Sequence, residues 1–226
     1  MTSTELLATL AMCVERGKVN AKAPFPPDLK GQDGADELTV QALAAGATPQ
    51  EVLTQALMVG MNRVGEKFRD KKIFVPDLLM AARAMNASMV HMQPYFKSAE
   101  VKLRGTVVIG TVAGDLHDIG KKLVAMMLEG AGWKIVDLGT DVSTQKFIDA
   151  VKENPQCVVG MSALLTTTMA SMEESVKKVK EIFPSTKVLV GGAPLTLEFA
   201  QKIGADFYSP DPQGAVEYLN TLQMTS

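Results

Sequence analysis

The first 93 residues carry apolar side chains at the three- and four-residue spacing of amphipathic helices. The first stripe starts at Leu6 and stops before Gly17, and a second covers about residues 35–45. Residues 48–51, Thr-Pro-Gln-Glu, predict a capping box that starts a third helix, and a fourth helix is expected from about Asp77. Four helices with mostly short connections predict a small bundle.

From Gly105 onward the pattern changes to short β-branched runs that alternate with amphipathic segments. This alternation predicts a Rossmann-like (flavodoxin-like) five-stranded parallel sheet covered on both faces by helices. The expected fold is therefore α plus α/β, with a helical domain at 1–93, a linker at 94–103 and an α/β domain at 104–226. The expected strands are 106–109, 134–138, 157–161, 187–190 and 206–208, and the expected helices are 120–131, 144–153, 172–183, 196–202 and 213–222.

Composition narrows the function classes without choosing one. The chain of 226 residues is 46% hydrophobic and has a net charge of −2, so no basic surface predicts binding to nucleic acid or to an anionic membrane. We expect no transmembrane helix, because the apolar runs are short and interrupted by charges. The N-terminus has no basic leader before an apolar core, which favours a cytoplasmic protein with Cys13 and Cys157 buried and reduced.

Three of the predicted strands end in loops with unusual chemistry. The first loop, 110–122, contains the motif Asp-x-His-x-x-Gly; the second, 162–168, is rich in hydroxyl groups; the third, 191–194, begins with two glycines. Because the carboxyl ends of parallel strands meet at one edge of a sheet, we expect these loops to converge. Together they offer an imidazole that could bind a metal, a carboxylate to orient it, several hydroxyls and a glycine-lined slot.

Each of these features has a simpler interpretation when taken alone. A single loop histidine is usually a surface residue, and Ser162 or the threonines at 166–168 could merely cap the helix that follows. The glycine pair could be a tight turn. His91, in the fourth predicted helix, has no matching His or Cys nearby in the sequence and is interpreted as a structural or surface residue. The conjunction of three loops at one sheet edge favours a ligand site over these alternatives.

The three loops, in this order, resemble the signature of the cobalamin-binding corrinoid proteins of methyltransferase systems. That signature is an Asp-x-His-x-x-Gly loop, then a Ser-x-Leu motif, then a Gly-Gly pair. The helical half also resembles the helical cap of this family at residues 60–61, 64–68 and 74–76. The residues that match the three motifs are Asp115, His117 and Gly120, then Ser162 and Leu164, then Gly191 and Gly192.

The resemblance implies a cobalt site. Cobalamin would bind with its own benzimidazole displaced, and His117 would be the lower axial ligand of cobalt. Asp115 would accept a hydrogen bond from the other ring nitrogen, with Thr168 as third member where relatives have serine. Gly120 would give clearance for the corrin ring. The other implied cofactor contacts are Ser162 and Thr166, which would hydrogen-bond the nucleotide tail, Gly191 and Gly192, which would leave room for it, and Asp118, Leu164 and Tyr208.

The resemblance also implies a function in anaerobic one-carbon metabolism. The protein would carry a methyl group between two methyltransferases, alternating between cob(I)alamin and methylcobalamin, and would not be a complete enzyme by itself. A substrate-specific methyltransferase would supply the methyl group from a methylamine, betaine, methanol or a methoxyarene. A second would pass it to tetrahydrofolate or coenzyme M, and a reductive activation protein would rescue cobalt(II). The helical cap would cover the upper face of the cofactor, with the linker as a hinge.

Three alternatives share parts of this architecture. A cobalamin-dependent sensor combines a bundle with this domain, but such regulators generally add a DNA-binding module, and no basic recognition helix is evident. The cobalamin subunit of a radical isomerase needs a substrate-binding barrel, and this sequence predicts none. A phosphoacceptor receiver domain needs an aspartate after the third strand, where this sequence has Met161-Ser162.

Overall fold

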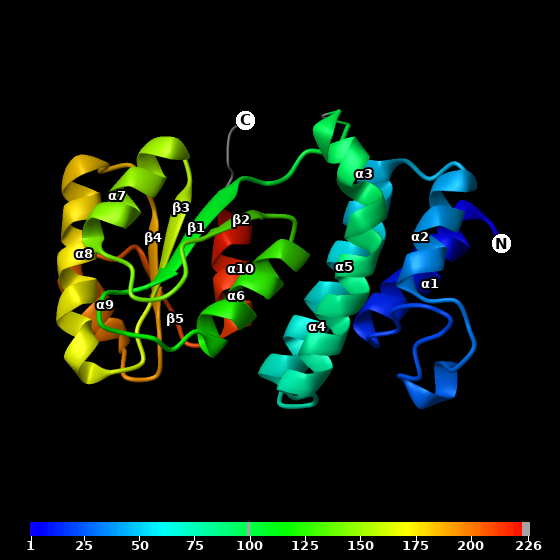
Figure 1. Cartoon of the computed structure of the whole chain (residues 1–226), viewed down its shortest axis with the longest axis horizontal. Helices are drawn as coiled ribbons and strands as arrows, with labels where there is room; N and C mark the ends of the chain where they lie inside the picture. Colours follow the sequence, from blue (N-terminus) through cyan, green and yellow to red (C-terminus); the bar gives the residue numbers. More distant parts are fainter. Residues whose placement is uncertain (99, 223–226) are drawn as a thin grey trace. The chain divides into compact units, whose positions relative to one another are not determined.

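The structure, a computed structural model, describes residues 1–98 and 100–222. It divides into two compact units (Figure 1). The first comprises Met1–Leu103 with the short stretch Gly130–Gly132, and the second comprises the rest of the chain from Arg104 onward. In the described part of the chain, no helix is both long and apolar enough to cross a membrane.

The first unit contains the four predicted helices. These are α1 (Ser3–Glu15), α2 (Ala35–Ala44), a continuous helix made of α3 (Pro49–Glu51), the π-helical stretch η2 (Val52–Leu57) and α4 (Met58–Arg69), and α5 (Val75–Lys97). The predicted capping box is present, since the Thr48 hydroxyl accepts from the Glu51 N–H and the Glu51 carboxylate accepts from the Thr48 N–H. The core of this unit is aliphatic and fully buried; it includes Leu10, Val14, Leu53, Leu57, Val64 and Leu78.

The end of α5 differs from the prediction. The helix continues through Pro94 to Lys97, so it extends four residues beyond the boundary expected at residue 93. Pro94 lies in the last turn of the helix, where the loss of one N–H and its hydrogen bond is tolerated. Its carbonyl still accepts from the Ser98 N–H at 3.1 Å. The connection between the two units is thus shorter than the predicted linker 94–103.

The second unit is a single parallel sheet with helices on both faces. Its strands are β1 (Thr106–Thr111), β2 (Lys134–Asp137), β3 (Val158–Ser162), β4 (Val188–Gly191) and β5 (Phe207–Ser209), in the order β2-β1-β3-β4-β5. Figure 1 shows α6 and α10 on one face of the sheet and α7, α8 and α9 on the other. These helices are α6 (Ile119–Gly130), α7 (Thr144–Glu153), α8 (Met169–Ile182), α9 (Leu197–Ile203) and α10 (Pro212–Thr221). The α plus α/β fold predicted from the sequence is confirmed.

The strand order defines where a ligand can bind. The connections from β1 and from β3 leave in opposite directions, and in folds of this kind ligands bind at the carboxyl ends of the two strands where the order reverses. The register of the sheet aligns Thr111 with Ser162, Ser162 with Gly191, and Gly191 with Ser209. The three polar or glycine-rich loops predicted from the sequence therefore leave the sheet from one row of residues.

Candidate functional site

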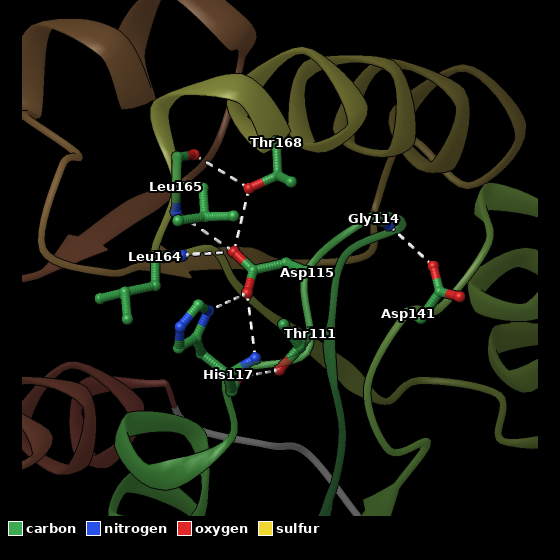
Figure 2. A network of polar contacts seen from close by, with 8 residues as sticks. All are labelled: Thr111, Gly114, Asp115, His117, Asp141, Leu164, Leu165 and Thr168. Atoms are coloured by element: carbon green, nitrogen blue, oxygen red, sulfur yellow. Dashed lines mark hydrogen bonds and ion pairs between the residues drawn. The ribbon is translucent and has the colours of Figure 1, made fainter.

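Asp115 and His117 lie on the loop that joins β1 to α6, at the carboxyl end of β1. Gly114 starts the turn with a φ of 82°, a conformation that glycine adopts without strain. The Asp115 carboxylate then caps its own loop, because Oδ1 accepts from the His117 N–H at 3.0 Å. The same oxygen lies 2.8 Å from Nδ1 of the His117 ring (Figure 2). The imidazole is thus held from one side by a neighbour two residues away.

The other oxygen of Asp115 connects the first loop to the second. Oδ2 accepts from the backbone N–H of Leu164 at 2.6 Å and from that of Leu165 at 3.2 Å. The hydroxyl of Thr168 lies 2.9 Å from the same oxygen, as Figure 2 shows. The carboxylate therefore has five donors although its side chain is fully buried.

This environment fixes the charge of Asp115 and the tautomer of His117. Burial raises the pKa of the Asp115 carboxyl, but the hydrogen bonds from the Leu164 and His117 backbone, the His117 ring and Thr168 outweigh it and hold the pKa well below its usual range. A charged carboxylate can only accept hydrogen bonds, so Nδ1 of His117 carries the proton. The lone pair of His117 is consequently on Nε2.

Nε2 is positioned to bind a metal. Within residues 1–98 and 100–222 no group hydrogen-bonds it, and the His117 side chain is 51% exposed. Neutral imidazole with its second nitrogen held by a carboxylate is a common metal-ligand arrangement in proteins.

The surface around His117 is apolar and open. Leu116 is 74% exposed and Ile119 69% exposed, and Leu164 and Leu165 on the second loop are 42% and 40% exposed. No atom lies within 4 Å of the position that a Cβ would take at Gly120. Exposed aliphatic side chains beside one metal-competent nitrogen fit a broad, largely apolar group that carries a metal, as a corrin ring does.

The other predicted site residues are placed as follows. The Ser162 hydroxyl is half-buried at the carboxyl end of β3 and, among the described residues, has no hydrogen-bond partner. Thr166 is exposed at the start of the turn η3 (Thr166–Thr168). Tyr208 is half-buried on β5 and packs against the core of the sheet. Asp118 forms an ion pair with Lys122 one turn along α6, so its carboxylate is engaged within that helix.

The second residue of the Gly-Gly pair must be glycine for a structural reason. Gly192 has a φ of 142°, and a Cβ there would lie 1.7 Å from the carbonyl oxygen of Ala163. The loops after β3 and β4 therefore approach each other closely at the backbone, and the fold itself demands glycine at this position. The predicted role of Gly191 and Gly192 in leaving room for a nucleotide tail stays a prediction.

Thr168 occupies the N-cap position of α8, but its hydroxyl does not cap that helix. The hydroxyl lies 2.9 Å from Asp115 Oδ2 and 2.9 Å from the Leu165 carbonyl oxygen, and the charged carboxylate is the stronger acceptor for its single proton. The simpler interpretation of this threonine as a helix cap is thus wrong.

Replacing Thr168 with valine is expected to destabilise the protein, because the isosteric side chain cannot donate to Asp115. A hydrogen bond to a charged group contributes about 1.5–3 kcal/mol to the free energy of unfolding, so the loss at pH 7 should fall in that range. Thr168→Ser keeps the donor and removes one methyl group, at a cost of about 0.8 kcal/mol. Urea denaturation of both variants measures the difference, and equal stability of Thr168→Val and the wild type would contradict this role.

Sequence reasoning missed four contributors to the site. Two are the main-chain donors at Leu164 and Leu165, which no side-chain pattern reveals. Thr111 is the third: its hydroxyl donates to the His117 carbonyl at 3.0 Å, and a polar residue at the end of an apolar strand could have signalled it. Asp141 is the fourth, since its carboxylate accepts from the Gly114 N–H at 2.7 Å.

Comparison with known proteins gives a consistent result. A family described as B12 binding domain matches residues 105–216, and a second B12 binding domain family matches residues 32–92. A trimethylamine corrinoid protein of Methanosarcina barkeri is 44% identical over 186 residues, which cover 80% of this chain and 86% of that protein.

Two solved structures are similar to this chain over both its helical and its α/β part. A cobalamin-binding protein from Desulfitobacterium hafniense DCB-2 is 30% identical, with a TM-score of 0.73 over 95% of this chain and 97% of that chain. A chain of the methanol:cobalamin methyltransferase complex MtaBC from Methanosarcina barkeri is 27% identical, with a TM-score of 0.80 over 96% of this chain and 81% of that chain.

The protein belongs to the family of cobalamin-binding corrinoid proteins. The family and the cofactor predicted from the sequence are thereby confirmed.

Proposed function

We propose that the protein is the methyl carrier of a methylamine methyltransferase system. The observation that carries this proposal is the His117 imidazole, whose Nδ1 is held at 2.8 Å by buried Asp115 while Nε2 is free on an open apolar surface. The names of the relatives support the methylamine class of donor, since they include a trimethylamine corrinoid protein.

The residues that would hold cobalamin come from all three loops. His117 would provide Nε2 as a ligand to cobalt, and Leu116, Ile119 and Leu164 would pack against the corrin ring beside Gly120. The hydroxyls of Ser162 and Thr166 would hydrogen-bond the nucleotide tail, which would lie toward Gly191, Gly192 and Tyr208. When bound, cobalamin supplies a cobalt centre that accepts a methyl group from one donor and releases it to another acceptor.

Asp115 orients the nitrogen of His117 that would bind the metal. Its charged carboxylate holds the proton on Nδ1, so the lone pair lies on Nε2. The carboxylate is itself held by the Leu164 and Leu165 N–H groups and by the Thr168 hydroxyl. The orientation of the His117 ring is therefore set by the two loops together.

The partners follow from the role of a carrier. Corrinoid proteins of this family act with methyltransferases, as the MtaBC complex illustrates for a structurally similar chain. For this protein the first partner would be an enzyme that demethylates a methylamine. A second methyltransferase would deliver the methyl group to tetrahydrofolate or coenzyme M, and a reductive activation protein would restore the reduced cofactor. The connection that follows α5 would be the hinge between the two units.

Reconstitution with candidate partners tests the proposal. The protein loaded with hydroxocobalamin is reduced with titanium(III) citrate and mixed with a trimethylamine, dimethylamine or monomethylamine methyltransferase and the matching amine. We expect one of these enzymes to methylate the bound corrinoid, as followed by absorption spectroscopy, whereas a methanol methyltransferase with methanol should not. Methylation by the methanol enzyme alone would overturn the methylamine assignment. A light-triggered change of oligomeric state without methyl transfer would favour a sensor.

A further inference from the structure

The segment from Asp137 to Val142, which joins β2 to α7, contacts both ends of the loop that carries His117. At the near end, Val142 donates its N–H to the Thr111 carbonyl at 2.9 Å, and Thr111 donates to the Gly139 carbonyl at 3.0 Å. These bonds extend the β1–β2 pairing past the last residues of the strands. The 137–142 segment is therefore fixed against the beginning of the His117 loop.

Asp141 makes the most specific of these contacts. Its carboxylate accepts from the Gly114 N–H at 2.7 Å, and its own N–H donates to the Asp115 carbonyl at 3.0 Å. Asp141 thus binds the two residues directly before the Leu116-His117 pair. Figure 2 shows Asp141 on the side opposite Leu164 and Leu165, so the loops after β2 and β3, the two strands that flank β1, hold the backbone and the carboxylate of Asp115 respectively.

The far end of the loop is held by an ion pair whose lysine is buried. Lys121, in the first turn of α6, has a side chain that is 1% exposed and pairs with the Asp137 carboxylate. Asp137 also accepts from the Gly139 N–H at 2.9 Å, which connects this pair to the rest of the 137–142 segment. The His117 loop is consequently held at Gly114 and at Lys121 by one segment.

The backbone of Asp141 indicates that this contact is maintained at a cost. Its φ is 52°, in the left-handed region that non-glycine residues adopt uncommonly, although aspartate tolerates it better than most. Both Asp141 and Gly114 are exposed, so water could satisfy the groups that they pair. Strain of this kind persists where the surrounding structure requires one particular conformation.

We propose that Asp141 is a positioning residue for the axial ligand: it fixes the Gly114–Asp115 backbone so that Asp115 holds the His117 ring with Nε2 directed to the cofactor. The inference rests on the proposed function, because it assigns His117 to cobalt. Asp141 itself is not a catalytic residue, since its contacts are to the backbone of the loop.

The test compares two variants that both tolerate the left-handed backbone. Asp141→Gly removes the acceptor without adding strain, and Asp141→Asn keeps an oxygen acceptor and removes only the charge. Gln156→Gly is the matched control, because Gln156 is also exposed and has a φ of 65°. It lies before the amino-terminal end of β3, whereas the site lies at the carboxyl ends of the strands. Any effect of added backbone freedom alone appears in this control.

Two readouts are measured on each protein. In the cobalamin-loaded protein, the absorption spectrum gives the ratio of His-on to His-off forms. We expect Asp141→Gly to lower this ratio about 10-fold, the lower end of the range for the loss of an outer partner of a metal ligand. Asp141→Asn should stay within about 2-fold, and Gln156→Gly should match the wild type.

The second readout needs no cofactor. In the cofactor-free protein, imidazole ¹⁵N NMR reports the Nδ1–H hydrogen bond of His117, assigned by reference to a His117→Ala sample since the chain has two histidines. Asp141→Gly should weaken that bond and Asp141→Asn should preserve it. Wild-type values of both readouts in folded Asp141→Gly would overturn the proposal. If wild-type protein shows no His-on spectrum, the proposed function fails, and the NMR comparison alone decides whether Asp141 positions the ring.

Discussion

His117→Ala is expected to abolish the His-on spectrum of the cobalamin-loaded protein while the corrinoid remains bound through the other two loops. Losing an outer partner of a metal ligand costs about 10–100-fold, so loss of the ligand itself should slow methyl transfer by more than about 100-fold. Imidazole added to the solution should restore part of the His-on spectrum, because the alanine leaves a space of matching shape beside Asp115. Absorption spectroscopy with and without imidazole makes the measurement.

His91→Ala is the control for this experiment. The His91 ring lies in the helical unit, with Nε2 2.6 Å from the Asp36 carboxylate, and no predicted cofactor contact involves it. Its removal should leave the spectrum unchanged. A wild-type spectrum from His117→Ala would show that cobalt is bound in another way and would refute the axial assignment.

Asp115→Asn is expected to cause the largest loss of stability of any isosteric change at the site. An amide has one oxygen, so its NH₂ group must face either the His117 donors or the donors at Leu164, Leu165 and Thr168. Buried donors left without an acceptor cost about 1–3 kcal/mol each, so we expect a loss of about 2–4 kcal/mol at pH 7. Urea denaturation at fixed pH provides the measurement.

The pH dependence of this effect has a definite sign. The pKa of Asp115 is lowered in the folded protein, whereas an unfolded aspartate titrates near pH 4, with a pKa of about 3.9. The charged carboxylate therefore contributes its full stabilisation above about pH 4, and this contribution is lost as the pH falls toward the pKa of the folded state. The gap in unfolding free energy between wild type and Asp115→Asn should narrow below about pH 4.

Asp149→Asn supplies the comparison for the acid titration. The Asp149 side chain is 52% exposed on α7 and, within residues 1–98 and 100–222, bonds only to Gln145 and Lys152 of its own helix, so this variant should follow the wild-type stability curve throughout. Two results would show that the buried charge does not stabilise the fold. One is a difference in unfolding free energy between wild type and Asp115→Asn that stays constant with pH. The other is a difference below about 1 kcal/mol at neutral pH.

The sequence predicts those features of the site that depend on the type and spacing of side chains. The β-branched run before Gly110 predicts a buried strand, and the two-residue spacing of Asp115 and His117 fits a carboxylate that folds back onto the next loop residues. The hydroxyl of Thr168 was expected to complete this pair from the resemblance alone, and it lies within hydrogen-bond distance of the carboxylate.

Other features could not be predicted because they depend on where the main chain lies. The N–H groups of Leu164 and Leu165 reach Asp115 only because the loop after β3 turns across the end of β1. Asp141 is an ordinary loop residue in the sequence, and its contact with Gly114 depends on an unusual backbone angle. Likewise, Pro94 suggested that a helix ends at residue 93, whereas α5 accommodates Pro94 in its last turn.

The use of main-chain donors at Leu164 and Leu165 has an evolutionary consequence. Every amino acid except proline offers the same N–H group, so mutation at these two positions leaves the anchoring of Asp115 intact. Their side chains are exposed and free to change in size or polarity. In the proposed binding mode, descendants of this protein could therefore change the polarity of the surface that faces the corrin without altering the hydrogen bonds that hold Asp115 and His117.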